Sequence, residues 1–342
     1  MADRFCLLDL NDVCVKTVLQ CFDVFDLISF SLCSKKRLRN VRSLKLHIED
    51  PHLFCDETFY ALFNFKGNVI KLLFCGNDKP LDEKNNTQRK LQVDYIEGCY
   101  RFEHLHRQDG NRKPPIRRWR KSNFRGNDWL RHFMDVINSD KIHSLLVLES
   151  KFEVDSLVDI VQNLSIVSFT TNHVTKPYIL SLLKAQPCLE NLSVDWLTFD
   201  EPSEYSVLLR NQQKLTIQEG AKIKLDIVLS VNSLAFECSG LPIKDVNRFI
   251  KLWKEGANPR LRCLCVRYYA NPAGEAVLNE NEVLRGVQCK RMPPRTVRMF
   301  EVAAYRMEID GGFDIVGKSG RKATVTLEDR AVYSIFCMFI WQ

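Results

Sequence analysis

The sequence predicts an α/β protein in which a small helical N-terminal segment precedes an array of parallel strands and helices, closed by antiparallel strands at the C-terminus. Three observations support this fold class. Apolar residues near the N-terminus recur at three- and four-residue steps, the spacing of amphipathic helices. From residue 142 onward, short apolar strand-like runs alternate with helix-like runs. Beyond residue 306, glycine turns separate three more strand-like runs, which is typical of an antiparallel meander.

The N-terminal segment is predicted to form two short amphipathic helices and a third, basic helix. The first apolar stripe runs from Leu10 to Phe22, and the second runs from Leu27 to Cys33. Asp26 precedes the second stripe, and aspartate is a good N-cap because its carboxylate accepts a backbone N–H. The third helix is expected from Lys35 to about Leu46. We expect Glu49-Asp50-Pro51 to end it, because the residue before a proline resists helical angles.

The ending Asp-Leu-x-x-x-Ser-x-Cys-x-Lys of the second stripe is more specific than helical spacing. Together with the first stripe, this ending resembles an F-box. The matching positions are Leu10, Val15, Val18, Leu19, Phe22, Asp23, Asp26, Leu27, Phe30, Ser31, Cys33 and Lys35. The family's proline is replaced by Asn11, which can cap the helix instead, and its usual acidic residue two positions further on is Val13. Spacing alone also fits an ordinary helical hairpin that caps a larger domain.

An F-box binds the Skp-type adaptor of a cullin-RING ubiquitin ligase, so the resemblance implies such a partner. The implied adaptor-binding surface consists of Leu10, Val15, Val18, Leu19, Phe22, Leu27 and Phe30. Some of these side chains complete the core of the helical segment and the others dock on the adaptor. The sequence does not show which of these residues belong to the core and which to the adaptor-binding surface.

Composition excludes several classes of protein. The chain has 342 residues, more than one typical domain, with 45% hydrophobic and 27% charged residues. The N-terminus lacks a signal-peptide pattern, and no apolar run approaches the roughly 18 residues of a membrane span. Its 13 cysteines include no C-x-x-C pair, so we expect reduced thiols and no metal site. We therefore expect a soluble protein of the cytoplasm, the nucleus or both, without a cofactor.

The net charge of +7 comes from one segment, Arg107 to Arg125. Gly110 and the Pro114-Pro115 pair mark it as a loop, and a charged loop is usually just solvated. Trp119 and Phe124 are interleaved with the arginines, and such an arrangement can bind phosphates and stack on bases. An alternative function is therefore an adaptor-bound scaffold that contacts RNA or anionic lipid through residues 112–125. We do not expect nucleic-acid or membrane binding as the main role.

The form L-x-x-L-x-L recurs from residue 142 with apolar substitutions. Its copies are Ile142-Leu145-Val147, Leu164-Val167-Phe169, Leu189-Leu192-Val194, Leu215-Ile217, Val231-Leu234-Phe236 and Leu261-Leu264-Val266, with Val69-Leu72-Phe74 as an earlier candidate. Helix-like runs separate them, at 153–162, 176–185, 221–230 and 242–254. The central positions lie 19 to 30 residues apart, close to the period of leucine-rich repeats. We expect an irregular leucine-rich-repeat-like array; an irregular α/β domain is the alternative.

Alternate residues of such strands point away from the helix-covered core and form one row per strand on a concave face. The predicted concave-face residues are Ser168, Thr170, Ser193, Asp195, Thr216, Gln218, Glu237 and Arg267. Their mixed polarity suits the recognition of another protein's surface. They do not form a catalytic constellation, and no nucleophile motif occurs elsewhere.

Residues 226–266 contain a long and unusual pattern. Asn-Ser before a strand is followed by Leu-x-x-x-Asp-x-Asn-x-Phe-x-Lys-x-Trp and then by Gly-x-Asn-Pro-Arg-Leu. The positions are Asn232, Ser233, Leu241, Asp245, Asn247, Phe249, Lys251, Trp253, Gly256, Asn258, Pro259, Arg260 and Leu261. This pattern resembles the type-2 F-box-associated domain, which is thought to hold the substrate. Phe249 and Trp253 lie one helical turn apart and should pack on the sheet.

Gly312 to Ser319 satisfies the P-loop pattern letter for letter. A P-loop needs a strand before it and a helix after it, so that backbone amides and a helix N-terminus hold the phosphates. Here, however, FDIV is expected to be a strand, Lys318-Ser-Gly-Arg a turn, and Lys322 to Leu327 another strand. We interpret the match as accidental.

These patterns predict three parts: an F-box at 1–48, a connecting α/β region at 49–141, and a leucine-rich-repeat-like, F-box-associated substrate-binding domain at 142–342. The resemblances imply a non-catalytic substrate-recognition subunit of a Skp-cullin-F-box ubiquitin ligase. Its partners would be a Skp-type adaptor, through it a cullin-RING ligase, and a protein substrate that the sequence does not name.

Overall fold

The computed structural model describes residues 7, 10–46, 48–76, 88–101, 116–195, 206, 209–218, 223–269, 278–303, 305–330 and 333–341. The architecture is mixed α/β. The chain forms two compact units, one made of residues 1–167 with 185–188 and the other of residues 168–184 with 189–342. The domain boundaries near residues 48 and 141 stay a prediction.

Unit 1 begins with three short helices. They are α1 (Asp12–Gln20), α2 (Val24–Leu32) and α3 (Lys35–Arg42). Each helix has a side-chain N-cap: Asn11 accepts from the Cys14 amide at 2.9 Å, Asp23 from the Asp26 amide at 2.7 Å, and Ser34 from the Arg37 amide at 3.2 Å. Asn11 thus caps the first helix as predicted. The N-cap of α2 is Asp23 and not Asp26, because the helix begins one turn earlier than its apolar stripe suggested.

The sheet of unit 1 runs in the order β6-β1-β2-β3-β4-β5. Its strands are β1 (Ile48–Cys55), β2 (Phe59–Phe65), β3 (Asn68–Cys75), β4 (Tyr95–Arg101), β5 (Arg117–Arg120) and β6 (Lys141–Leu148). Strand β1 pairs parallel with β6, whereas β1 to β5 form an antiparallel meander. Two helices follow in this unit, α4 (Gly126–Ile137) and α5 (Val154–Val161).

Two predictions about this region are wrong. The third helix ends at Arg42, and Pro51 lies inside β1, at a register shift between Glu49 and His52. A bulge tolerates proline because its missing N–H need not join the ladder. Strand β3 contains Val69-Leu72-Phe74 but is antiparallel to both neighbours, so it is not an earlier copy of the parallel repeat.

In unit 2 the parallel strands are β7 (Ser165–Asn172, in this unit from Ser168), β8 (Asn191–Asp195), β9 (Lys214–Gln218), β10 (Ala235–Ser239) and β11 (Cys263–Tyr269). Each pairs parallel with the next. The helices are α6 (Lys176–Ala185), α8 (Leu225–Ser230), α9 (Ile243–Lys254) and α10 (Glu280–Val283). The predicted alternation of parallel strands and helices is therefore present; its likeness to a leucine-rich repeat stays a prediction.

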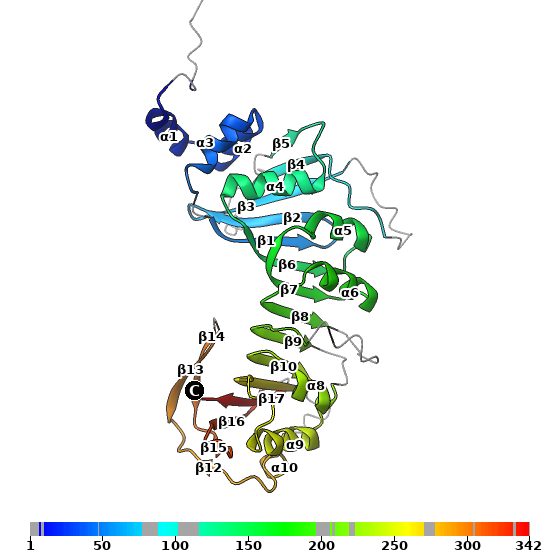
Figure 1. Cartoon of the computed structure of the whole chain (residues 1–342), viewed down its shortest axis with the longest axis vertical. Helices are drawn as coiled ribbons and strands as arrows, with labels where there is room; N and C mark the ends of the chain where they lie inside the picture. The colour runs from blue at the N-terminus through cyan, green and yellow to red at the C-terminus, as the bar shows by residue number, and fades with distance from the viewer. Residues whose placement is uncertain are drawn as a thin grey trace, which may run out of the picture. The chain divides into compact units, whose positions relative to one another are not determined.

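Antiparallel strands close the sheet of unit 2, as predicted. After β11 the order is β17 (Tyr333–Ile340), β16 (Lys322–Asp329), β15 (Phe313–Val316) and β12 (Lys290–Arg291). The first run beyond residue 306 was predicted as a strand of this meander; it is instead β14 (Tyr305–Asp310), which pairs with β13 (Val297–Val302) in a separate hairpin that was not predicted. It packs on this sheet through Phe300, Val302 and Ile309, which bury against Ala235, Cys263 and Phe339. Helices α8 and α9 lie on the opposite side of the sheet from this hairpin (Figure 1).

Candidate protein-interaction surfaces

The structure divides the apolar residues of the three N-terminal helices into two groups. Val15, Leu19 and Leu27 are buried and form the core of this helical segment. Leu10, Val18, Phe22 and Phe30 are only half-buried and stay accessible. The two phenylalanine rings meet edge to face with their centroids 6.2 Å apart. The predicted adaptor-binding set thus contains three structural residues and four that can contact a partner.

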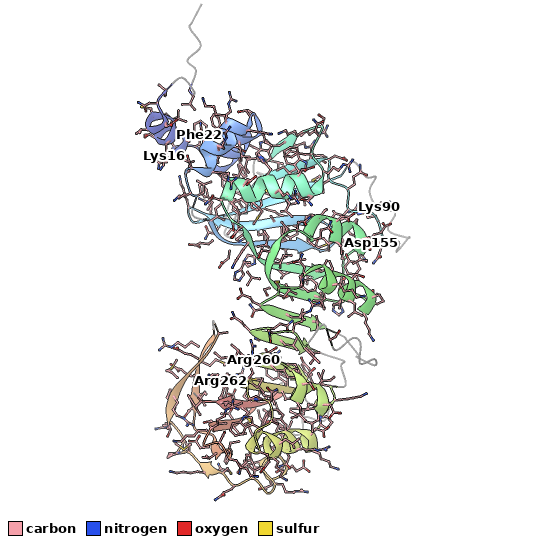
Figure 2. All side chains as sticks on the ribbon, viewed as in Figure 1. Lys16, Phe22, Lys90, Asp155, Arg260 and Arg262 are labelled. Atoms are coloured by element: carbon pink, nitrogen blue, oxygen red, sulfur yellow. The ribbon has the colours of Figure 1, made fainter. Side chains whose placement is uncertain are left out.

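The most accessible apolar residue of these helices is Val13 on α1, which is 74% exposed. It was not among the predicted adaptor-binding residues. It lines a pocket of about 310 Å³ together with residues of α1 and α3, namely Asp12, Val15, Lys16, Leu19, Asn40 and Ser43. Lys16 and Phe22 both lie in this helical part of unit 1 (Figure 2). Its position in the sequence could have indicated its exposure, because Val13 stands where the F-box pattern has an acidic residue. We call Leu10, Val13, Val18, Phe22 and Phe30 the N-terminal apolar surface.

Helix α2 is fixed to the edge of the unit 1 sheet. Phe25 is buried with its ring centroid 4.7 Å from that of Tyr100 and 5.9 Å from that of Trp119. The Trp119 indole donates a hydrogen bond to the Ser29 hydroxyl at 2.8 Å. Arg117 on β5 forms an ion pair with Asp26 and lies 3.6 Å from the Asp23 carboxylate. The helical segment is therefore part of unit 1 and not a free appendage.

The prediction that residues 107–125 form a basic loop is wrong for residues 117–120, in the part of this segment that the structure describes. Residues 117–120 are strand β5, and Trp119 is buried at 8% exposure. Phe124 stacks edge to face on Trp129, with ring centroids 4.9 Å apart. Arg118 pairs with Glu97, as Arg117 does with Asp26. The aromatic rings are thus used in packing and two of the arginines in ion pairs, so this strand gives the RNA or lipid alternative little support. Residues 107–115 of that segment lie outside the described part of the chain.

The predicted concave-face residues of unit 2 do share one face of the sheet. Thr170 is opposite Ser193, Ser193 is opposite Thr216, and Thr216 is opposite Glu237 in register. Ser168 and Arg267 lie on the same face by alternation along β7 and β11. The side chains of Asp195 and Gln218 are outside the described part of the structure, although their backbones end β8 and β9. We call Ser168, Thr170, Ser193, Thr216, Glu237 and Arg267 the polar sheet face.

The charged part of the polar sheet face is paired internally. The Lys214 ammonium lies 3.0 Å from one Glu237 carboxylate oxygen, and Arg267 binds the other oxygen. All three side chains are largely buried, with 16 to 32% of their side-chain surface exposed. Partial burial strengthens such ion pairs relative to fully solvated ones. Lys214 was not among the predicted residues, because a lysine at the first position of a strand usually indicates a solvent-exposed side chain. The result is a cluster of two cations and one carboxylate.

The β13–β14 hairpin restricts the accessible extent of the same face. It covers Ala235, Cys263 and Phe339, and Cys265 packs partly against it. Thr170 and Ser193, on β7 and β8, stay half-exposed. The residues best placed to meet a partner are therefore Ser168, Thr170 and Ser193, flanked by the Lys214–Glu237–Arg267 cluster. This arrangement offers hydroxyl groups and charge for hydrogen bonding.

Several residues of the 226–266 pattern hold the fold together. The Asn258 side-chain amide donates to the Val228 and Val231 carbonyls at 2.9 and 3.2 Å, and its oxygen accepts from the Leu261 amide. Asn247 donates to the Val283 carbonyl at 2.8 Å, which holds α10 against α9. Phe249 and Trp253 are buried as predicted. The pattern therefore marks a structural framework around the polar sheet face.

The P-loop match does not form a P-loop. Strand β15 ends at Val316, and a turn leads directly into β16, with Val316 paired to Lys322. The backbone amide of Lys318 donates to the Lys254 carbonyl at 2.8 Å, and its ammonium pairs with Glu255. Because a strand occupies the place of the helix, no N-terminal amides converge on a phosphate. This agrees with the interpretation of the match as accidental.

Within the described residues, no group of three His, Cys, Asp or Glu side chains is arranged to hold a metal ion. In the same part of the chain, none of the helices has the length and apolar character needed to cross a membrane.

Residues 205–266 match the sequence model of a family described as F-box associated. The matched segment contains β9, α8, β10, α9 and most of β11, and thus carries Thr216 and Glu237 of the polar sheet face. The match confirms the resemblance inferred for this region, and it does not extend to the N-terminal helices. No curated protein matches the chain, and no solved structure matches it.

Proposed function

We propose that this chain is a non-catalytic substrate-recognition subunit of a Skp-cullin-F-box type ubiquitin ligase. The observation that carries the proposal is the F-box-associated match at residues 205–266 in a chain whose N-terminus folds into three short helices with an accessible apolar surface. The F-box resemblance supplies the adaptor, and the associated domain supplies the substrate surface. A cytoplasmic or nuclear location is part of the same proposal.

In this proposal the N-terminal apolar surface docks on a Skp-type adaptor. Val13 adds apolar area at a position where the F-box pattern has an acidic residue, and it is the most exposed apolar side chain of these helices. Phe22 and Phe30 add aromatic area, and aromatic anchors contribute strongly to protein interfaces. Val15, Leu19 and Leu27 support the surface from beneath. The ion pair between Arg117 and Asp26 holds α2, and with it Phe30, on the rest of unit 1.

The polar sheet face is the proposed substrate surface. The half-exposed hydroxyl groups of Ser168, Thr170 and Ser193 suit a polar protein segment, because each can exchange hydrogen bonds with a partner, and the Lys214–Glu237–Arg267 cluster lies beside them. The chain acts by proximity: a bound target lysine reaches a high effective concentration near a ubiquitin-loaded enzyme, and the receptor makes no covalent contribution.

Co-purification of the full chain with a purified Skp-type adaptor tests the proposal. We expect stoichiometric capture by the wild type and a loss of about tenfold or more in affinity for Phe22→Asp, since a carboxylate in the apolar contact stays unpaired. Phe22 lies in the turn between α1 and α2 and is only half-buried, so both helices should remain folded. A second variant, Phe30→Ala, should weaken capture independently.

The matched control is Val297→Asp, which places the same charge on β13, at an apolar residue that is 57% exposed. This control should bind the adaptor as the wild type does. Absence of capture by the wild type, or unchanged capture by both Phe22→Asp and Phe30→Ala, would contradict the proposal.

A further inference from the structure

Three thiols gather on the hairpin-facing side of the unit 2 sheet. Cys263 and Cys265 are alternate residues of β11, and their sulfur atoms lie 3.7 Å apart. Cys337 lies on β17, directly opposite Cys265 in the antiparallel register. Cys265 and Cys337 are half-buried, and both pack against the cluster under the β13–β14 hairpin. No part of the proposed function uses these thiols.

The hydrogen-bonding pattern between β11 and β17 determines how close Cys265 and Cys337 lie. The Ile340 amide donates to the Arg262 carbonyl at 2.7 Å, which makes these two residues a hydrogen-bonded pair. Hydrogen-bonded and non-hydrogen-bonded pairs alternate along an antiparallel ladder, so Cys265 and Cys337 form a non-hydrogen-bonded pair. The α-carbons of such a pair are about 4.5 Å apart, within the range of about 4.4 to 6.8 Å that a disulfide spans. The backbone therefore already holds the two residues at bridging distance.

The three thiols differ in reactivity. Hydrogen bonds from the Cys263 and Cys337 thiols lower the pKa of Cys265, and this effect outweighs the burial that would raise it. The same hydrogen bonds, together with burial, raise the pKa of Cys263 and of Cys337. By contrast, Cys238 on the neighbouring strand β10 is fully enclosed, and burial raises its pKa. A thiolate is the reactive form of cysteine, so Cys265 is the nucleophile of the cluster.

We propose that Cys265 and Cys337 are an oxidation site at which a hydroperoxide, such as hydrogen peroxide, closes a cross-strand disulfide between β11 and β17. The disulfide joins the parallel strands of unit 2 to its closing meander. The proposal does not depend on the adaptor or on a substrate.

The reaction has two steps. The Cys265 thiolate attacks the peroxide, an S–O bond forms as the O–O bond breaks, and the leaving hydroxide takes a proton to become water. The Cys337 sulfur, losing its proton, then attacks the Cys265 sulfenic acid; the S–S bond forms, the S–O bond breaks, and a second water leaves. Two thiols are oxidised and one peroxide is reduced to two waters.

Peptide mapping of the full chain tests the site. The native protein is treated with hydrogen peroxide, its remaining thiols are blocked with N-ethylmaleimide, and it is digested with trypsin without reduction. Trypsin cleaves after Arg262 and Arg267 and releases a peptide, residues 263–267, that contains Cys263 and Cys265, whereas Cys337 lies in the C-terminal peptide 331–342. We expect these two peptides joined, with a mass equal to their sum less two hydrogen atoms plus one N-ethylmaleimide on Cys263. We also expect Cys238 to remain unoxidised at a peroxide dose that forms this cross-link.

Single cysteine variants show which two cysteines form the disulfide. Cys263→Ser should keep the cross-link, and Cys337→Ser should lose it while leaving a Cys265 sulfenic acid that dimedone captures. Loss of two hydrogens within peptide 263–267 alone would show an intrastrand Cys263–Cys265 bond and would overturn the proposal. It would also be overturned if Cys265 stayed fully alkylatable at a peroxide dose that oxidises the exposed Cys188.

Discussion

The Ser31 hydroxyl and the His132 imidazole form a buried hydrogen bond, 2.8 Å from Oγ to Nε2, that joins α2 to α4 within unit 1. Ser31 has one hydroxyl proton, and it donates that proton to the Ile28 carbonyl at 2.7 Å. His132 must therefore donate from Nε2, which assigns its neutral tautomer. The serine belongs to the ending of the F-box-like pattern, so one residue of that pattern binds the rest of unit 1 rather than a partner.

The burial of His132 predicts a pH dependence of stability. Burial, and to a lesser extent Lys121, lowers the pKa of His132 to about 4. Because the unfolded state has an ordinary histidine pKa, it binds more protons than the folded state between these values, and stability falls as the pH drops below about 6.5. We expect the free energy of unfolding to decrease by about 2 kcal/mol from pH 7 to pH 5 through this group.

Urea unfolding of the wild type and of His132→Gln at both pH values isolates the effect. The variant lacks the titrating ring, so its stability should change less with pH than that of the wild type, whatever its absolute stability. Equal pH dependence in the two proteins would show that His132 does not carry the effect.

A second prediction concerns Gly98 on β4, which lets α2 approach the sheet. A Cβ added there would lie 2.8 Å from a ring carbon of Phe25 and 2.9 Å from two ring carbons of Trp119. Because both rings are buried, Gly98→Ala should lower the free energy of unfolding by about 1 to 3 kcal/mol, the usual cost of overpacking a core. Cys99→Ala, at the next position of β4, serves as the control. Chemical unfolding measures both, and a Gly98→Ala protein as stable as the wild type would refute this account of the packing.

How far the sequence predicts the fold depends on whether the signal is local. The parallel strands of unit 2 were predictable because most of the apolar runs are followed by a helix-like run, and the sequence order then favours the pairing of successive strands. The run that forms β14 was predicted as a strand of the meander, because alternation of apolar residues identifies a strand without showing which surface it packs on. The β13–β14 hairpin as a separate sheet was therefore not predicted. Its partners, such as Ala235 and Cys263, lie far away in the chain. Trp119 was misassigned for the same reason: nothing near it in the sequence indicates its contact with Ser29.

The candidate surfaces show the same limit. Alternation along the strands placed Thr170, Ser193 and Thr216 on one face, and their register agrees. The pairing of Glu237 with Lys214 and Arg267 was not predictable, because it depends on which strands are neighbours. At the N-terminus, helical spacing identified an apolar stripe but did not separate buried Leu19 from accessible Phe22. That division required the contacts of α1 with α3 and the rest of the helical segment.

The accidental P-loop match gives a third prediction. Lys318 pairs with Glu255 on the surface, with 74% of its side chain exposed, and no helix follows it. Magnesium–ATP should therefore not raise the melting temperature of the wild type. Lys318→Ala should alter stability by less than about 1 kcal/mol, because exposed ion pairs contribute little. Thermal-shift titration checks both, and a nucleotide-dependent stabilisation that Lys318→Ala abolishes would restore the nucleotide-binding interpretation.

The last prediction concerns Arg298, which holds the β13–β14 hairpin to the meander of unit 2. Its Nη1 lies 3.0 Å from an Asp314 carboxylate oxygen, and its Nη2 donates to the Gly311 carbonyl at 3.1 Å. Its guanidinium also lies over the Trp341 ring, 5.2 Å from the centroid. A lysine keeps the charge but cannot make these three contacts at once, since it lacks the planar fork of arginine.

Arg298→Lys should therefore lower the free energy of unfolding of unit 2 by about 1 kcal/mol, after allowance for its partial exposure. The hairpin offers a matched control in Arg306, which pairs with Glu301 at 3.2 Å while both side chains are about two-thirds exposed. Arg306→Lys should change stability by less than about 0.5 kcal/mol. Thermal unfolding followed by tryptophan fluorescence compares the two. Equal losses would mean that the hairpin is held by its apolar side chains alone, because only Arg298 reaches across to Asp314.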